Sequence, residues 1–137
     1  MEALGRLFNV LAVADDVYVG LKDAGGATFL CTNAAGDTWT LTEARDAAGT
    51  GAQVLATITG YYTQATVGAA WARQTQAAAS TVVTTASQDV AVIEIEEAEL
   101  SDGYTHIKIA STSTGTVVAI PRDLKVQRAP ANLQALV

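Results

Sequence analysis

The densest group of chemically active side chains is an acidic cluster in the last third of the sequence. It consists of Glu94, Glu96, Glu97, Glu99 and Asp102. Glu94 and Glu96 fall on one face of an expected strand, about 6.6 Å apart by strand rise. That spacing suits a carboxylate pair in glycoside hydrolysis or a calcium site. Because no Asp-rich calcium loop and no aromatic sugar platform accompanies the pair, we expect a solvated face or turn, with an interface to a basic patch as the alternative.

Neither the single histidine nor the one glycine-rich stretch has the sequence context of a site. His106 shares the polar face of its expected strand with Tyr104 and Lys108, which favours an exposed or interface position over a metal or base role. Residues 49–51, Gly-Thr-Gly, lack the later glycine and the Lys-Ser/Thr pair of a phosphate loop. No G-x-S-x-G motif is present. We therefore expect no catalytic residues, no cofactor, no metal and no enzyme activity.

The cysteine and the large aromatic residues are expected to be packing groups. Cys31 stands beside Phe29 in an apolar-leaning run and is expected to be a buried small hydrophobe; a lone cysteine cannot form an internal disulfide. The large aromatics could form a ligand platform, but a β core or an interface is the commoner place for them. They are Trp39, Trp71, Tyr61 and Tyr62.

The elements that position these groups are expected to be strands, because apolar and polar residues alternate with period two along most of the chain. The expected strands are residues 7–14, 16–22, 27–32, 38–44, 54–64, 69–79, 81–86, 90–96, 104–110 and 116–120. Roughly ten short strands at regular spacing predict an all-β fold, an antiparallel β-sandwich or barrel. Alanines in 69–79 also suit a helix, but the neighbouring threonines and Trp71 favour a strand. Residues 97–100 fit a single helical turn.

Two local signals refine this pattern. The turn at residues 23–26 predicts a hairpin between the strands on either side of it. Pro121 interrupts the closing strand and marks an edge, a bulge or a strand switch, after which 123–128 alternates again.

The chain is expected to form one domain with extended terminal segments, since its 137 residues match the usual size of a single domain. Within this single β domain, 1–137, we expect residues 1–6 to form an N-terminal segment and residues 129–137 a C-terminal arm.

Composition limits the classes of partner. Only 16% of residues are charged, against about 25% in typical soluble domains, which suggests that partner subunits cover part of the surface. The net charge of −6 argues against nucleic-acid binding. No run approaches the ~18 apolar residues of a membrane helix, and the first residues lack the charge and apolar length of a signal peptide. We expect a soluble, uncleaved chain with no membrane partner.

Basic residues are skewed toward the C-terminal third. Four of the eight, Lys108, Arg122, Lys125 and Arg128, lie there, whereas the glutamates concentrate in 94–99. Separated acidic and basic regions would allow head-to-tail pairing between copies, or docking on a charged lattice.

Three stretches resemble small virion proteins of tailed bacteriophages. They are the ending 122–133, R-D-L-K-V-Q-R-A-P-A-N-L; the middle segments 61–64, Y-Y-T-Q, 68–71, G-A-A-W, and 76–79, Q-A-A-A; and residues 98–104, A-E-L-S-D-G-Y. The resemblance implies a decoration or cement subunit on the outside of a capsid, assembled in the host cytoplasm and then part of the virion. It implies two partners, an HK97-type major capsid protein and further copies of the chain itself, and no enzyme activity.

The expected mechanism is stapling, in which apolar terminal segments bridge neighbouring subunits and many modest contacts add up over a lattice. The residues expected at this interface are Leu7, Phe8, Leu133, Leu136 and Val137.

Three other functions remain open. A head–tail connector or tail component would occur in few copies at one vertex or along the tail. A carbohydrate-binding β-sandwich for host adhesion would need exposed aromatics such as Trp71 or Tyr62. An enzyme would have to use the pair Glu94 and Glu96.

Overall fold

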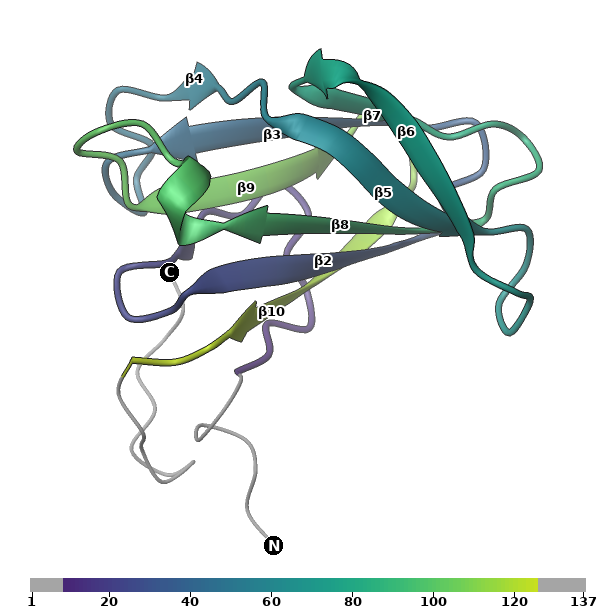
Figure 1. Cartoon of the computed structure of the whole chain (residues 1–137), viewed down its shortest axis with the longest axis horizontal. Coiled ribbons are helices and arrows are strands. Elements are labelled where there is room, and N and C mark those ends of the chain that lie inside the picture. The colour runs from purple at the N-terminus through teal and green to yellow at the C-terminus, as the bar shows by residue number, and fades with distance from the viewer. Residues whose placement is uncertain (1–8, 126–137) are drawn as a thin grey trace, which may run out of the picture.

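The computed structural model describes residues 9–125, which fold as two β-sheets packed around one apolar core (Figure 1). Sheet A has the strand order β10-β2-β8-β5-β6; sheet B has the order β1-β9-β3-β4, with β7 also paired to β3. The strands are β1 (Val19–Gly20), β2 (Gly26–Thr32), β3 (Thr38–Ala44), β4 (Gln53–Val54), β5 (Ile58–Gln64), β6 (Ala72–Ala79), β7 (Thr81–Val83), β8 (Val90–Glu96), β9 (His106–Ser111) and β10 (Thr116–Arg122). The all-β prediction is confirmed, and the architecture is the sandwich.

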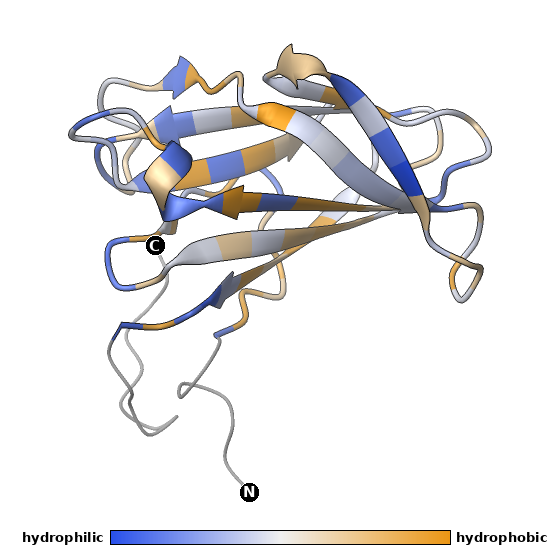
Figure 2. Cartoon of the chain, viewed as in Figure 1, coloured by the Kyte–Doolittle hydropathy of each residue, from blue (hydrophilic) through white to orange (hydrophobic). Residues whose placement is uncertain are grey.

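The core lies between the inner faces of the two sheets, where alternate residues of each strand meet. Sheet A contributes Ala27, Phe29, Cys31, Ile93, Ile95, Val117 and Ala119, and sheet B contributes Trp39, Leu41, Ile107 and Ile109. Apolar residues accordingly recur along β8 and β9 (Figure 2). The predicted inner faces of β3 and β9 are confirmed. So are the strand over 72–79 and the single turn after β8, which is the 3-10 helix η1 (Glu97–Glu99).

The predicted hairpin across residues 23–26 is wrong. β1 pairs with β9 in sheet B, whereas β2 pairs with β8 and β10 in sheet A. The turn therefore carries the chain from one sheet to the other. A turn signal reports a change of direction, and it cannot say which sheet receives the next strand.

Two expected strands are shorter than predicted for the same reason. The span 54–64 divides into β4 in sheet B and β5 in sheet A, and residues 55–57 cross between them. The span 81–86 keeps only β7, because the chain leaves sheet A after β6 and enters sheet B across Ser80.

Pro121 does not interrupt the closing strand. β10 continues through it, and Pro121 pairs with Ala27 on β2. Because β10 is the outermost strand of sheet A, a residue without an N–H group fits there, as the edge interpretation predicted. The strand ends at Arg122, because the next residue, Asp123, has a left-handed φ of 52°, and residues 123–125 form no strand. The rest of the predicted strand 123–128 lies outside the described residues.

The expected strand over 7–14 is reduced to a strap along the edge of β10. In its described part, Leu11 forms an isolated bridge with Ala119, and the Ala14 N–H donates to the Val117 carbonyl at 2.8 Å. Leu11 and Ala14 face the core, while Val10 and Val13 face solvent. The run is apolar on both of its sides, although only one side packs against the core.

Candidate functional site: the outer face of sheet A

Arg122 forms ion pairs with both members of the acidic pair, Glu94 and Glu96. Strand register aligns Arg122 on β10, Gly26 on β2 and Glu96 on β8 in one row across the sheet. Since Gly26 has no side chain, the guanidinium of Arg122 reaches across β2; a Cβ built at Gly26 would lie 3.3 Å from its Nη2 and closer still to the Ile95 carbonyl. The glutamates therefore belong to an ion cluster and are not a bare carboxylate pair.

Three carboxylates surround this one cation. The Arg122 Nε lies 2.8 Å from Glu94 Oε1 without the alignment of a hydrogen bond; Nη2 contacts Glu96, and Nη1 lies 2.6 Å from Asp123 Oδ2. Burial acts to lower the pKa of Arg122, but the hydrogen bonds from Glu96 and Asp123 and the charge of Glu94 outweigh it, so the pKa lies above its ordinary value.

Basic and acidic regions pair within the chain instead of remaining separate. Besides the Arg122 cluster, Lys125 Nζ lies 3.2 Å from Glu97 Oε2, and Lys108 Nζ lies 2.5 Å from Asp16 Oδ1. The charge separation expected to drive head-to-tail pairing is therefore largely cancelled inside one molecule. Arg128 lies outside the described residues.

His106 and the glycine stretch have structural settings. His106 is half-buried, with Nδ1 2.8 Å from the Thr105 hydroxyl; burial lowers its pKa, and the charge of Asp46 offsets part of that effect. Residues 49–51 form part of the loop between β3 and β4, where Asp46 Oδ1 accepts the Thr50 N–H at 3.0 Å. Among residues 9–125, no group of three or more His, Cys, Asp or Glu side chains could hold a metal ion.

Two buried carboxylates are occupied by structural hydrogen bonds. Asp37 Oδ1 accepts the N–H groups of Thr38 (2.7 Å) and Thr112 (3.1 Å) and the Thr112 hydroxyl (3.0 Å), and its Oδ2 accepts the Ser111 hydroxyl at 2.5 Å. Glu43 accepts from the Gln53 amide at 2.6 Å and from the Ser101 N–H at 2.9 Å. Both carboxylates join loops to strands and present no free acceptor to a substrate.

An apolar row crosses the outer face of sheet A. The register places Val118 beside Leu30, Leu30 beside Val92, Val92 beside Tyr62, and Tyr62 beside Arg73. These five residues come from β10, β2, β8, β5 and β6 in turn, so the row spans the whole sheet. The outer face of sheet A therefore carries an apolar row that ends at Arg73 and runs beside the ion cluster of Arg122, and an exposed apolar row of this kind is typical of a surface that contacts a further molecule.

The row ends in an exposed aromatic pair. Tyr62 is 47% exposed and Trp71, just before β6, is 49% exposed; with Val92 they line a cavity of about 300 Å³. Of the large aromatics expected in the core or at an interface, Trp39 is fully buried in the core, whereas Tyr62 and Trp71 lie outside it. In a two-layer sandwich only the inner face of each sheet contributes to the core, and Tyr62 and Trp71 lie on the outer side of sheet A.

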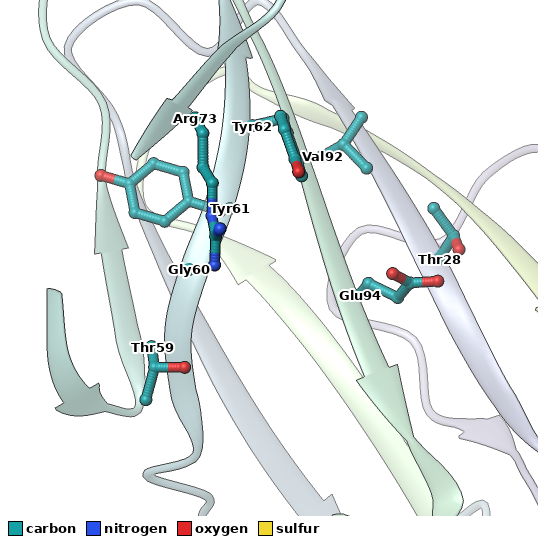
Figure 3. A pocket seen from close by; sticks show the side chains of 8 residues that line it. All are labelled: Thr28, Thr59, Gly60, Tyr61, Tyr62, Arg73, Val92 and Glu94. Atoms are coloured by element: carbon teal, nitrogen blue, oxygen red, sulfur yellow. The ribbon is translucent and has the colours of Figure 1, made fainter. Parts of the chain in front are cut away.

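A second, more polar cavity of about 530 Å³ adjoins the first and shares Tyr62 and Val92 with it (Figure 3). Its other lining residues are Thr28, Thr59, Gly60, Tyr61, Arg73 and Glu94. We call the two cavities together the outer groove. The sequence analysis found no aromatic platform beside the glutamate pair, yet the fold brings Tyr62 and Glu94 to one cavity wall.

Arg73 is the uncompensated charge of the outer groove. Glu94 is held by Arg122, whereas Arg73 has no hydrogen bond and no ion pair within the described part of the chain. Its guanidinium lies over Gly60, where a built Cβ would come within 3.7 Å of Nη2. Figure 3 shows the Arg73 side chain extending toward Gly60, with Tyr62 on one side. Sequence reasoning missed Arg73, because its importance depends on which strands become neighbours.

The interface residues expected from the sequence, Leu7, Phe8, Leu133, Leu136 and Val137, all lie outside the described residues. No helix in the described part of the chain is long and apolar enough to cross a membrane. The chain matches no protein-family model, no curated protein and no solved structure.

Proposed function

We propose that the protein is a non-enzymatic structural subunit of a tailed-bacteriophage virion. In this role it assembles in the host cytoplasm and binds the outside of the capsid as a decoration or cement subunit. Its partners are an HK97-type major capsid protein and further copies of itself. The proposal rests on the resemblance carried by residues 122–133, 61–79 and 98–104, together with one feature of the fold.

That feature is the edge of sheet A where the described chain begins and ends. The Asn9 N–H donates to the Pro121 carbonyl at 2.9 Å, and the Lys125 N–H donates to the Asp23 carbonyl at 2.8 Å. The described chain therefore both begins and ends near β10. Val13, 77% exposed, and Val10, 40% exposed, add apolar surface at this edge. Exposed apolar surface of this kind is what attachment to a neighbouring subunit would use.

The deciding experiment locates the protein in purified particles. Cryo-electron microscopy and quantitative mass spectrometry are expected to find it on the capsid surface in many copies. A few copies at one vertex or along the tail would replace this proposal with the connector or tail alternative. Absence from the particle would refute both.

A truncation tests the staple itself. Deletion of 129–137 is expected to reduce co-sedimentation with capsids while the buried Trp39 keeps its native fluorescence. The control is a full-length variant with Val67→Ser, which removes a 77% exposed valine from the loop between β5 and β6, and it should bind normally. Normal decoration by the truncated protein would show that the arm is not a staple.

A second candidate function, carbohydrate binding for host adhesion, is favoured by the exposed pair Tyr62 and Trp71 on one cavity wall. Flat aromatic faces stack on the C–H faces of sugar rings, and exposed aromatics of this kind are costly to leave in water without a partner. Loss of glycan binding on Trp71→Ala or Tyr62→Ala would support this function; unchanged binding would remove it.

A further inference from the structure

We propose that the outer groove binds an acidic saccharide, a sugar unit that carries a carboxylate. The sugar ring lies against Tyr62 and Trp71, and the carboxylate pairs with Arg73. This inference rests on the carbohydrate-binding candidate above and names the chemical class of its ligand.

The apolar half of the groove provides a surface for a ring. Tyr62, Trp71 and Val92 line the cavity of about 300 Å³, which is at the small end of the range for small-molecule sites. Tyr62 and Trp71 are both about half exposed, so each can present a ring face to a ligand. Substituting either residue removes ligand contacts without opening the core, since both lie on the outer side of the sheet.

The polar half of the groove selects for a negative charge. Glu94 is paired with Arg122, whose Nε lies 2.8 Å from Glu94 Oε1, while the Arg73 side chain has no hydrogen bond and no ion pair among the described residues. A guanidinium offers two parallel N–H donors that match a carboxylate, which makes an arginine–carboxylate pair both strong and directional. Because Gly60 has no side chain, no Cβ occupies the space beside the Arg73 guanidinium.

The remaining wall residues suit hydroxyl groups. Thr28 and Thr59 offer donors and acceptors, and Glu94 can accept from a sugar hydroxyl while it stays paired with Arg122. Within the outer groove a nucleic acid would meet one unpaired cation, Arg73, in a molecule of net charge −6, which is too little positive charge to hold a polyanion. A single carboxylate balances the one unpaired cation that lines the groove.

The position of the groove leaves it accessible in a particle. β6 and β10 are the opposite edges of sheet A, so Arg73 and Trp71 are at the far edge from Asn9 and Pro121. A subunit attached through the β10 edge would present the groove outward.

The experiment titrates the full chain with oligogalacturonate and with a neutral galacto-oligosaccharide of equal length, by calorimetry and by NMR. Oligogalacturonate is expected to bind more tightly, and its affinity should fall with added salt. Arg73→Met, which keeps the aliphatic stem, should weaken oligogalacturonate binding by about tenfold to a hundredfold and leave the neutral sugar unaffected. Trp71→Ala should weaken both ligands. Arg45→Met is the matched control, because Arg45 stacks on Tyr104 outside the outer groove.

The outcomes separate the two ideas. Equal affinity for the acidic and neutral sugars, with no effect of Arg73→Met, would overturn the inference and leave carbohydrate binding standing. Failure of the wild-type protein to bind either sugar at millimolar concentration would overturn both. Binding of an acidic peptide in place of either sugar would also overturn both, since the groove would then recognise a peptide.

Discussion

Replacement of Asp37 with alanine is expected to lower the free energy of unfolding by about 3–5 kcal/mol. The Asp37 carboxylate is buried and accepts four hydrogen bonds, which tie the start of β3 to the loop between β9 and β10. At about 1.5 kcal/mol for each bond to a charged acceptor, the low end of the usual range, the four bonds together contribute ~6 kcal/mol. Removing the carboxylate also removes its desolvation penalty, which offsets part of the loss, while the N–H groups of Thr38 and Thr112 lose an acceptor.

Asp37→Asn removes the negative charge of the side chain but keeps its size and one acceptor oxygen. The amide oxygen can still accept from Thr38 and Thr112, but the amide nitrogen cannot accept from Ser111, so we expect a smaller loss of about 1–2 kcal/mol at pH 7.

The pH dependence gives a second, independent readout. Burial acts to raise the pKa of Asp37, but hydrogen bonds from Ser111, Thr38 and Thr112 outweigh it and hold the pKa below its usual value. Because the folded-state pKa is depressed, the stabilisation is fully present above the unfolded-state pKa of about 3.9 and is lost as pH falls through the folded-state value. The stability gap between wild type and Asp37→Asn should therefore narrow as pH falls below about 4.

The assay is urea unfolding followed by the fluorescence of Trp39, which is fully buried, at pH 7, 5 and 3. A loss below about 1 kcal/mol for Asp37→Ala would refute the reasoning from hydrogen bonds. A gap between wild type and Asp37→Asn that stays constant from pH 7 to pH 3 would refute the assignment of a stabilising charge.

Three further predictions concern packing, charge and reactivity. Arg122→Met should lower the free energy of unfolding by only about 1 kcal/mol, since its carboxylate partners are half exposed, and 1 M salt in the urea titration should shrink the difference. Gly115→Ala should cost at least about 3 kcal/mol, because its Cβ would overlap the Trp39 ring and lie 2.7 Å from an Asp37 oxygen. Gly68→Ala, at a position with φ of +86° and open space, is the control and should cost about 1–2 kcal/mol from backbone strain alone; an equal loss at both sites in thermal melts would contradict the overlap. Burial, together with the charges of Asp15 and Asp37, raises the pKa of the Cys31 thiol well above its ordinary value, so a thiol reagent should react only as the protein unfolds in urea; rapid reaction in native buffer would contradict this burial.

Residue alternation is a local property, and it predicted the strands well. β3 and β8 coincide with the predicted ranges, and the buried faces of β3 and β9 follow from their threonine or polar alternation. The threonines and Trp71 near β6 also outweighed its alanine content, and the strand they favoured is present. These features depend on neighbours two residues away, which the sequence displays directly.

Which sheet a strand joins depends on residues far apart in the sequence, and the alternation of apolar and polar residues gives no information about it. The turn before β2 and the crossing at Ser80 look like hairpin turns, yet each moves the chain to the opposite sheet. The outer groove could not be predicted for the same reason. Tyr62, Val92 and Arg73 become neighbours only through the pairing of β5 with both β8 and β6. Trp71 was a candidate for a ligand platform from the sequence, but Arg73 carried no signal of its own.

The strand order also dictates when the protein can fold. β2 lies between β8 and β10, so Phe29 and its neighbours keep both backbone edges unpaired until those two distant strands have been synthesised. The strap at Leu11 likewise waits for Ala119. Bringing such distant segments together is slow, because the chain loses the entropy of closing a long loop before the contacts that stabilise the loop have formed. On a ribosome, the nascent chain therefore presents apolar strands with open edges for most of its synthesis, and its yield in cells will depend on chaperone binding and growth temperature more than on the stability of the finished sandwich.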